Sequence, residues 1–291
     1  MTLVMQDQAA GLRRLFSRGA VRTVAFVSGA RQPARSPLVA DVAVALARRG
    51  SAVCVVDQGD VRAGAAARLG LHCRRDLADC LRHGLAPEDV AVSGPEGVRF
   101  VAARQVDRLL PDLDARDEAR LASLLRRAQP AADVVLLDIA TARSDSGAAW
   151  AAAAAEIVVV VQAAPDGVTD AYAVVKRLSR GTARRRFHVV VTGAAEEEQA
   201  RTVCGTLGAT AERFLSVRVA WLGWLPPDAD MATALRLRQA VASAFPASRS
   251  AGEIGSIADM LIGWSYPGED DLDGFVHRLR EMSRAAVSEN A

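Results

Sequence analysis

The sequence contains very little lysine: Lys176 is the only one among 36 basic residues, and all the others are arginine. The 34 acidic residues leave a net charge of only +2. A charge so close to balance provides no overall field that would favour nucleic acid or a membrane surface. We interpret the arginine excess as a compositional bias of the source genome, and it does not by itself predict RNA or DNA binding.

Cysteine is also scarce, and the four cysteines are irregularly spaced, without a preceding secretory signal. This pattern predicts a reducing cytosol. His72, Cys73, Cys80 and His83 lie close together, but the two cysteines are seven residues apart and no second pair follows, so we predict no zinc site. The stretch 76–85 instead has the pattern of an amphipathic helix that ends at a glycine.

The sequence has no long uninterrupted apolar run. The longest apolar region, residues 147–164, contains Glu156 and Gln162, which favours a helix followed by a buried strand over a membrane span. With 291 residues and 51% hydrophobic content, the chain can still build a sizeable core.

Short aliphatic runs alternate with helical patterns along most of the sequence. This alternation predicts an α/β fold with a doubly wound, mostly parallel sheet flanked by helices. We expect an N-terminal peptide over residues 1–18, one α/β domain over 19–264, and a linker with a final helix over 265–291. The predicted strands cover residues 21–27, 52–56, 98–102, 134–137, 157–161, 188–191 and 219–222, and the predicted helices 38–49, 76–85, 117–129, 167–179, 196–213, 231–245 and 252–263.

Residues 28–37 connect the first strand to the first helix, where a phosphate-binding loop would lie. Such a loop needs several backbone N–H groups that converge on the phosphate, usually from glycines, and a lysine. Gly29 is the only glycine here, Pro33 has no N–H, and Lys176 is far away in the sequence. The stretch therefore resembles a phosphate loop that has lost its chemistry.

Two aliphatic strands end in aspartates, Asp57 and Asp138. Ligands bind beyond the carboxyl ends of parallel strands, so both carboxylates are expected in the same crevice as the loop. The run before Asp138 has the Walker B pattern, in which the carboxylate holds a magnesium-bound water. The alternative is that Asp138 only caps the loop that follows, since residues 139–142 contain no glycine.

Both ends of the chain carry amphipathic helical patterns. Leu12, Leu15 and Phe16 share one face of a short N-terminal helix that either packs on its own domain or folds on a partner. In the last helix, Leu272, Phe275, Val276, Leu279 and Met282 form an apolar stripe with arginines nearby. Such a stripe packs on the body, on a partner, or on a membrane surface.

Several motifs together resemble the flagellar-number regulators FlhG and FleN, within the MinD/ParA group of deviant-Walker ATPases. The stretch Asp7-Gln8-Ala9-x-x-Leu12-Arg13 is similar to the N-terminal peptide of that family. Residues 165–172 are similar to its Pro-Thr-Ser-Ile-Thr-Asp-Ala-Tyr motif, and residues 222–228 to its Leu-Gly-x-Ile-Pro-x-Asp strand end. The order and spacing of these motifs, up to about residue 264, carry the resemblance.

The resemblance implies a MinD/ParA-like P-loop fold, ATP-dependent face-to-face dimerisation, and control of flagellar number. It implies that Asp7, Gln8, Leu12 and Arg13 dock on the flagellar GTPase FlhF and stimulate it. It also implies inner-membrane association through the C-terminal helix, where Phe275, Val276 and Leu279 would contact the membrane or a partner. Flagellar switch proteins and transcription regulators are further implied partners.

The nucleotide site departs from the family pattern. Ala30 and Arg35 stand where the family has its two lysines, and a planar guanidinium is a poor replacement for an ammonium in a tight loop. Gly59 replaces the aspartate that positions the attacking water, with Asp60 one residue away, and Thr192 replaces an adenine-binding asparagine. If ATP and magnesium still bind, the residues left to hold them are Gly29, Arg35, Ser36, Asp57 and Asp138.

These losses predict a pseudo-ATPase: a cytoplasmic or peripheral inner-membrane regulator that acts through protein partners, with no catalytic residue, resident metal, cofactor or direct nucleic-acid contact. One alternative is a divergent but active Mg-ATP hydrolase of the FlhG type. Another is a ParA-like DNA-partitioning or transcription-modulating module, for which Arg184, Arg185 and Arg186 form the only basic run.

Overall fold

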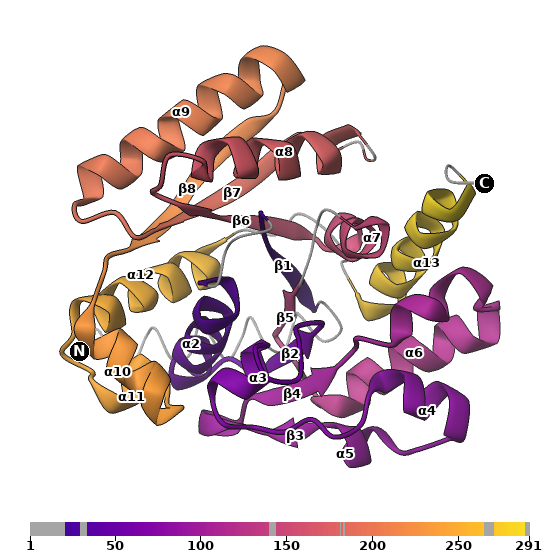
Figure 1. The fold of residues 1–291 in the computed structure, drawn as a ribbon. Coiled ribbons are helices and arrows are strands. Elements are labelled where there is room, and N and C mark those ends of the chain that lie inside the picture. The colour runs from indigo at the N-terminus through magenta and orange to yellow at the C-terminus, as the bar shows by residue number, and fades with distance from the viewer. Residues whose placement is uncertain are drawn as a thin grey trace, which may run out of the picture.

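An eight-stranded sheet forms the centre of the computed structural model, which describes residues 21–29, 34–139, 144–180, 182, 184–264 and 271–288 (Figure 1). The strand order is β3-β4-β2-β5-β1-β6-β7-β8, and all neighbours are parallel except β3 and β4. The predicted doubly wound sheet is confirmed. The strands are β1 (Arg22–Ser28), β2 (Val53–Asp57), β3 (Val92–Ser93), β4 (Arg99–Ala102), β5 (Val134–Asp138), β6 (Glu156–Gln162), β7 (Arg186–Thr192) and β8 (Arg218–Leu225).

Helices cover both faces of the sheet and bury one apolar core on each side. One core lies under α2 (Arg35–Arg48), α3 (Ala65–Arg68), α10 (Ala229–Leu237), α11 (Val241–Ala244) and α12 (Arg249–Gly263). The other lies under α4 (Leu77–His83), α5 (Pro87–Val90), α6 (Ala115–Ala128), α7 (Asp145–Ala153), α8 (Gly167–Arg180), α9 (Glu197–Leu215) and α13 (Leu272–Ser288). Short 3-10 turns are η1 (Pro95–Gly97), η2 (Val106–Arg108) and η3 (Leu110–Asp112).

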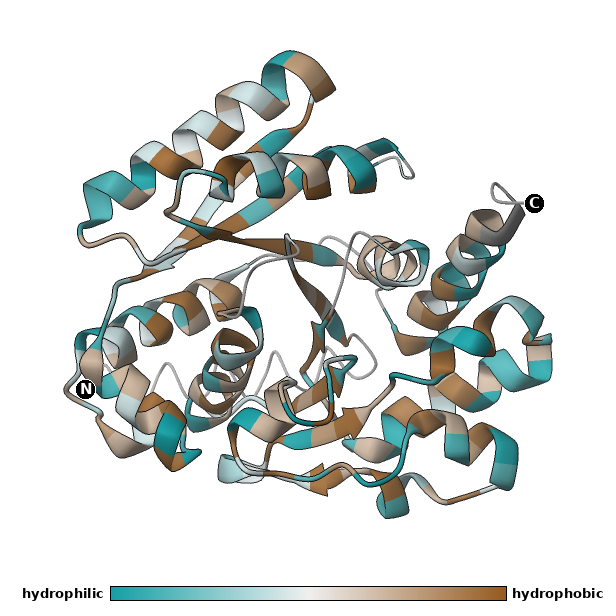
Figure 2. Ribbon diagram, in the orientation of Figure 1, coloured by the Kyte–Doolittle hydropathy of each residue, from teal (hydrophilic) through white to brown (hydrophobic). Residues whose placement is uncertain are grey.

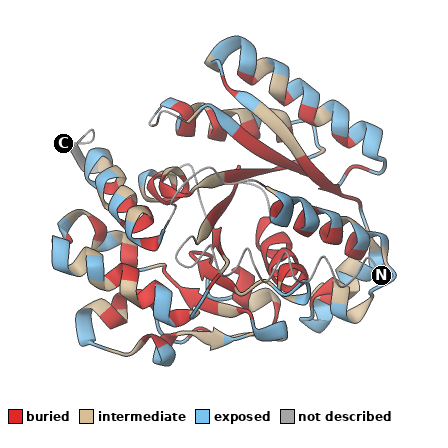
Figure 3. Ribbon diagram, turned by 180° about the vertical axis from the view of Figure 1, so that it is seen from behind, coloured by how far each residue is buried: buried red, intermediate tan, exposed pale blue. Residues whose placement is uncertain are grey.

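The distribution of apolar residues explains this layering. The inner strands are mostly brown in Figure 2 and red in Figure 3, because residues of a parallel sheet are buried on both faces, whereas the edge strand β8 is only partly buried over its first half. α2 is buried along most of its length, whereas α9 exposes a polar outer face (Figure 3). Among the described residues, no helix is long and apolar enough to cross a membrane.

The predicted helix 231–245 is wrong in one respect: it is two helices, α10 and α11. Arg238 ends α10 in the left-handed conformation, with φ of 56°. α11 then begins where the backbone N–H of Val241 donates to the carboxylate of Asp41 on α2, at 2.7 Å. The break is therefore set by a contact between residues 200 positions apart, which helical periodicity does not contain.

The C-terminal helix α13 is part of the main body. Phe275, Val276 and Leu279 are fully buried against α6 and α7, in the same core as the sheet. The ring of Phe275 lies 6.0 Å from that of Trp150 on α7, and Arg280 pairs with Glu118 on α6 at 2.6 Å. In this conformation the apolar stripe covers the protein itself, and membrane or partner contact by these side chains would require α13 to leave its place.

Candidate functional site

The segment predicted as an altered phosphate loop begins at the carboxyl end of β1. Gly29 follows the strand, and α2 starts at Arg35; residues 30–33 lie outside the described residues. A Cβ atom on Gly29 would lie 2.7 Å from Cβ of Asp170 on α8, so the close approach of that helix accounts for this glycine. Arg35 and Ser36, the two residues expected to face a phosphate and a magnesium ion, are buried at the start of α2.

Arg35 points into the site and binds the protein's own carboxylate. Its Nε donates to Oδ1 of Asp138 at 2.5 Å, and its two terminal nitrogens lie 3.3 Å from Oγ of Ser28 and 3.1 Å from Oγ of Ser36. The side chain of Arg35 is 9% exposed and that of Asp138 is fully buried. The guanidinium therefore provides a buried counter-charge for Asp138, where a magnesium-bound water would lie in an active site.

Asp57 and Asp138 lie side by side because β2 and β5 are neighbours in which these two residues are register partners. Oδ1 and Oδ2 of Asp57 accept from the backbone N–H groups of Gly59 and Ala66, at 2.7 and 2.9 Å. Oδ2 of Asp138 accepts from the N–H of Ala65 at 3.1 Å. Together with Arg35, these donors give each of the four carboxylate oxygens a hydrogen bond from the protein.

The charge of Asp138 makes the ionisation of Asp57 less favourable. Burial first, and then the charge of Asp138, raise the pKa of Asp57 to about 6, against the opposing effect of the two backbone hydrogen bonds. A magnesium ion would relieve this repulsion in an ATPase. Here Arg35 and the backbone of the loop 58–66 do so.

The loop that closes on these carboxylates depends on two glycines. A Cβ on Gly64 would lie 2.4 and 2.5 Å from the two carboxylate oxygens of Asp57, and one on Gly59 would lie 2.5 Å from Cα of Gly64. The turn is also fixed by Asp60, whose backbone carbonyl accepts from the N–H of Gly64 at 2.7 Å. We name this arrangement of Arg35, Asp57 and Asp138 with the loop 58–66 the carboxylate latch.

Replacing Gly64 with alanine should destabilise the protein by about 1–3 kcal/mol, because the new methyl group overlaps a buried carboxylate. The change would be measured by urea unfolding. Gly252→Ala is the matched control: it lies in α12 with no atom near the added Cβ, so the helix should gain up to about 1 kcal/mol. Equal effects of the two substitutions would show that loop 58–66 does not hold Asp57 as described.

Other candidates from the sequence lie elsewhere. Asp60 is exposed, and its carboxylate accepts from the N–H of Arg62 within its own turn, so it does not substitute for the missing water-positioning aspartate. Cys73 and Cys80 are buried in cores on opposite faces of the sheet and do not share a site. Asp7, Gln8, Leu12 and Arg13 lie outside the described residues.

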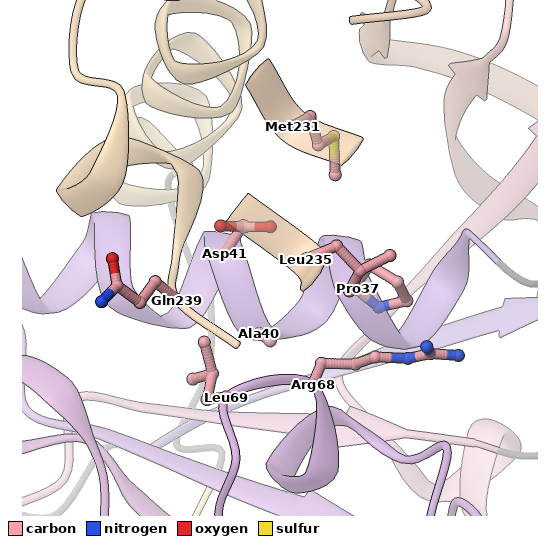
Figure 4. A pocket seen from close by; sticks show the side chains of 8 residues that line it. All are labelled: Pro37, Ala40, Asp41, Arg68, Leu69, Met231, Leu235 and Gln239. Atoms are coloured by element: carbon pink, nitrogen blue, oxygen red, sulfur yellow. The ribbon is translucent and has the colours of Figure 1, made fainter. Parts of the chain in front are cut away.

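A small polar cavity lies between α2, α3 and α10. Its volume is about 10 Å³, room for roughly one water, and it is bounded by Asp41 and Pro37 of α2, Arg68 of α3, and Gln239 after α10 (Figure 4). Asp41 points from α2 toward the segment that contains α10 and α11 (Figure 4). This cavity is far too small for a nucleotide.

Asp41 predicts a distinctive pH dependence. Burial raises its pKa to about 7 from 3.8, opposed by the hydrogen bond from Val241, so the folded state binds a proton that the unfolded state has released. The stability from this proton is complete below about pH 4 and disappears as the pH rises through about 7. Asp41→Asn, whose amide oxygen still accepts from Val241, should flatten the fall in the free energy of unfolding across this range. Asp89→Asn, at an exposed site, should leave that profile unchanged.

Comparison with known proteins identifies relatives of this chain in sequence and in fold. No family model matches the sequence. The chain is 29% identical over 270 residues to the antiactivator FleN of Pseudomonas aeruginosa, covering 92% of this chain and 96% of FleN. The resemblance to the FlhG/FleN group is confirmed. This FleN-like chain also shares the MinD/ParA fold, which agrees with the prediction from its strand and helix pattern.

Two solved structures illustrate the shared fold. The MinD cell division protein of Aquifex aeolicus has a TM-score of 0.64 and 19% identity, covering 84% of this FleN-like chain and 98% of MinD. MinD of Pyrococcus horikoshii, solved with Mg-ADP, has a TM-score of 0.62 and 18% identity, covering 84% and 96%. At these identities the similarity concerns the fold, so the state of the nucleotide site is judged from the contacts of Arg35 and the two aspartates.

The sequence identified Arg35, Ser36, Asp57 and Asp138 as neighbours, and the structure brings all four together. It did not identify Gly64 or the backbone donors at Ala65 and Ala66. The only sequence signal for them was a pair of glycines five residues apart after an aspartate. This spacing does not by itself predict that the loop folds back onto the carboxylate of Asp57.

Proposed function

We propose that this protein is a FleN-like regulator of flagellar number that acts through protein partners and does not hydrolyse ATP. The observation that carries the proposal is the 2.5 Å ion pair between Arg35 and Asp138. The residue expected to neutralise phosphate is bound to the residue expected to hold a magnesium-bound water. Similarity to FleN over nearly the whole chain supports the flagellar role.

Magnesium and ATP do not fit this arrangement of residues. A magnesium ion at Asp138 would have to displace a buried cation, and it would find the hydroxyl of Ser36 already accepting from Arg35. A phosphate would meet a guanidinium whose charge Asp138 already neutralises. Each lost electrostatic contact in an active site commonly costs about 3–4 kcal/mol of barrier, so several together leave no useful turnover.

Calorimetric titration of ATP and of ADP, each with magnesium, tests the proposal. We expect no saturable binding at the latch and no phosphate release. Hydrolysis by purified protein that disappears in Arg35→Ala would support the divergent ATPase instead. Arg75→Ala, an exposed arginine in the segment beside β4 that makes none of the contacts of the latch, is the control for an unspecific effect of losing one charge.

The partner proposal concerns the N-terminal peptide. We propose that Asp7, Gln8, Leu12 and Arg13 bind the GTPase FlhF, on the basis of the motif alone. The double substitution Gln8→Ala/Leu12→Ala should abolish stimulation of GTP hydrolysis, whereas Arg14→Ala, outside the motif and off the apolar face, should not. Equal stimulation by a chain lacking residues 1–16 would contradict the assignment.

We further propose a cytoplasmic location. Contact with the inner membrane through α13 would need Phe275, Val276 and Leu279 to leave the core described above. Vesicle flotation of the full chain, compared with a Phe275→Ser variant, measures whether they do.

A further inference from the structure

A larger cavity lies at the amino-terminal ends of the strands, whereas the carboxylate latch lies at their carboxyl ends. Its volume is about 380 Å³, and it lies where β6 and β7 begin, between the C-terminal end of α8 and the helices α7 and α13 (Figure 1). It is open to solvent and is lined by Arg184, Arg185 and Arg186, together with Glu156 and with Met282 of α13. The volume is in the range typical of small-ligand sites.

Two of these arginines are held in place by the ends of helices. Arg184 donates to the carbonyl of Ala155 at 2.6 Å and to that of Ala154, just after α7. One terminal nitrogen of Arg185 donates to the carbonyls of Ser179 and Thr182, at 3.2 and 3.4 Å, at the end of α8. These contacts orient the guanidinium groups before any ligand arrives, which lowers the entropy cost of binding.

Donors remain free after these contacts. A guanidinium has five N–H groups. In the described part of the chain, Nε and the second terminal nitrogen of Arg185 have no hydrogen-bond partner, and the guanidinium of Arg186 makes no hydrogen bond, although its charge attracts the carboxylate of Glu156. Hydrogen bonds to the helix ends therefore account for the position of Arg184 and for one terminal nitrogen of Arg185. They do not account for the guanidinium of Arg186.

The charge of the cavity favours an anion. Glu156 is the one acidic residue among the lining residues, and its carboxylate lies 3.1 Å from Nε2 of His188. Burial would raise the pKa of Glu156, but the hydrogen bond to His188 and the charges of Arg186 and Arg184 hold it below its ordinary value. Glu156 is thus ionised at neutral pH, and the three arginines leave the cavity with a net positive charge.

We propose that this cavity binds a phosphate ester, with the phosphate held by Arg185 and Arg186 and the rest of the ligand against Met282 and Ala152. Guanidinium groups match phosphate oxygens in a planar, two-bond geometry. The ligand is a soluble phosphate compound or the headgroup of an anionic lipid. The site is separate from the latch and does not depend on the proposal that ATP hydrolysis is lost.

The test uses the full chain and two probes. Inorganic pyrophosphate is titrated by calorimetry, and flotation is measured with phosphatidylcholine vesicles with and without phosphatidylglycerol. Arg185→Ala/Arg186→Ala should weaken binding by at least about tenfold, because charged hydrogen bonds to phosphate are among the stronger ones. Arg75→Ala is the matched control and should bind as the wild type does.

The outcomes separate the two sources and the alternatives. Pyrophosphate binding alone supports a soluble ligand, and binding that requires phosphatidylglycerol supports a lipid headgroup. Failure of both probes, or equal binding by the double variant, overturns the proposal, as does tighter binding of a DNA duplex than of pyrophosphate.

A single variant guards against misfolding of the double variant. Arg186→Gln keeps a polar side chain at an exposed position, so its expected loss of affinity does not depend on the double variant folding. If the ATP titration shows binding that is retained in Arg35→Ala but lost in Arg186→Gln, the ATP is bound in this cavity and not at the latch.

Discussion

Replacing Arg35 with alanine is expected to lower the free energy of unfolding by about 3–5 kcal/mol, because it leaves a fully buried carboxylate without its partner. In an ordinary nucleotide-binding loop, the residue at this position serves the ligand, and its removal would affect binding more than folding. Here the side chain joins the start of α2 to the end of β5. Urea unfolding at neutral pH measures the difference.

A double-mutant cycle isolates the ion pair. In an Asp138→Asn background, removing Arg35 should cost much less, because no buried charge is left behind. Arg35→Lys should lie between wild type and Arg35→Ala, since it keeps the charge but loses the contacts of the planar fork. Arg75→Ala, at an exposed site, should change stability by no more than about 0.5 kcal/mol. An Arg35→Ala protein as stable as the wild type would mean that the latch contributes nothing to the fold.

Phe275→Ala is expected to destabilise the protein by about 3–5 kcal/mol, in the range for aromatic residues deleted from a core. Phe275 is fully buried and packs against Trp150, which is itself fully buried. Loss of the ring would leave a cavity between α7 and α13. The unfolding transition of the whole domain should move to lower urea concentration, because α13 shares its core with the sheet.

Glu281→Ala, on the exposed side of the same helix, is the control and should leave the unfolding midpoint nearly unchanged. If Phe275→Ala also left the midpoint unchanged, α13 would be a separate element that detaches without unfolding the body. A helix that detaches so easily would be available for a membrane or a partner. The prediction therefore distinguishes a structural role of the apolar stripe from the membrane role that the family resemblance implies.

The sheet could be predicted because its strands are continuous aliphatic runs, and a carboxylate at the end of such a run has a fixed place in a parallel sheet. Asp57 and Asp138 were located in this way, and their pairing follows from the order of β2 and β5. The two-residue strand β3 was missed, because it is held only by antiparallel pairing with β4 and carries no pattern of its own.

The contact made by Arg35 could not be predicted. A motif comparison places this residue opposite a phosphate, and it takes the folded geometry to show that a guanidinium at the start of α2 reaches Asp138 directly. The same holds for Asp41, whose role at the start of α11 depends on where a distant segment packs. In both cases a charged side chain is visible in the sequence, but the group that it contacts is determined by the tertiary fold.

The closed turn at residues 59–64 has a consequence for how such a regulator can be controlled. In a nucleotide-dependent protein, the position of a loop like this one reports whether ATP or ADP is bound. Here Gly59 and Gly64 let the turn rest directly on Asp57, so its position is fixed by covalent structure and packing. On the proposal that ATP is not hydrolysed at the latch, the position of this turn would not depend on which nucleotide is present, and the influence of the protein would vary with its amount and with the partners and ligands available.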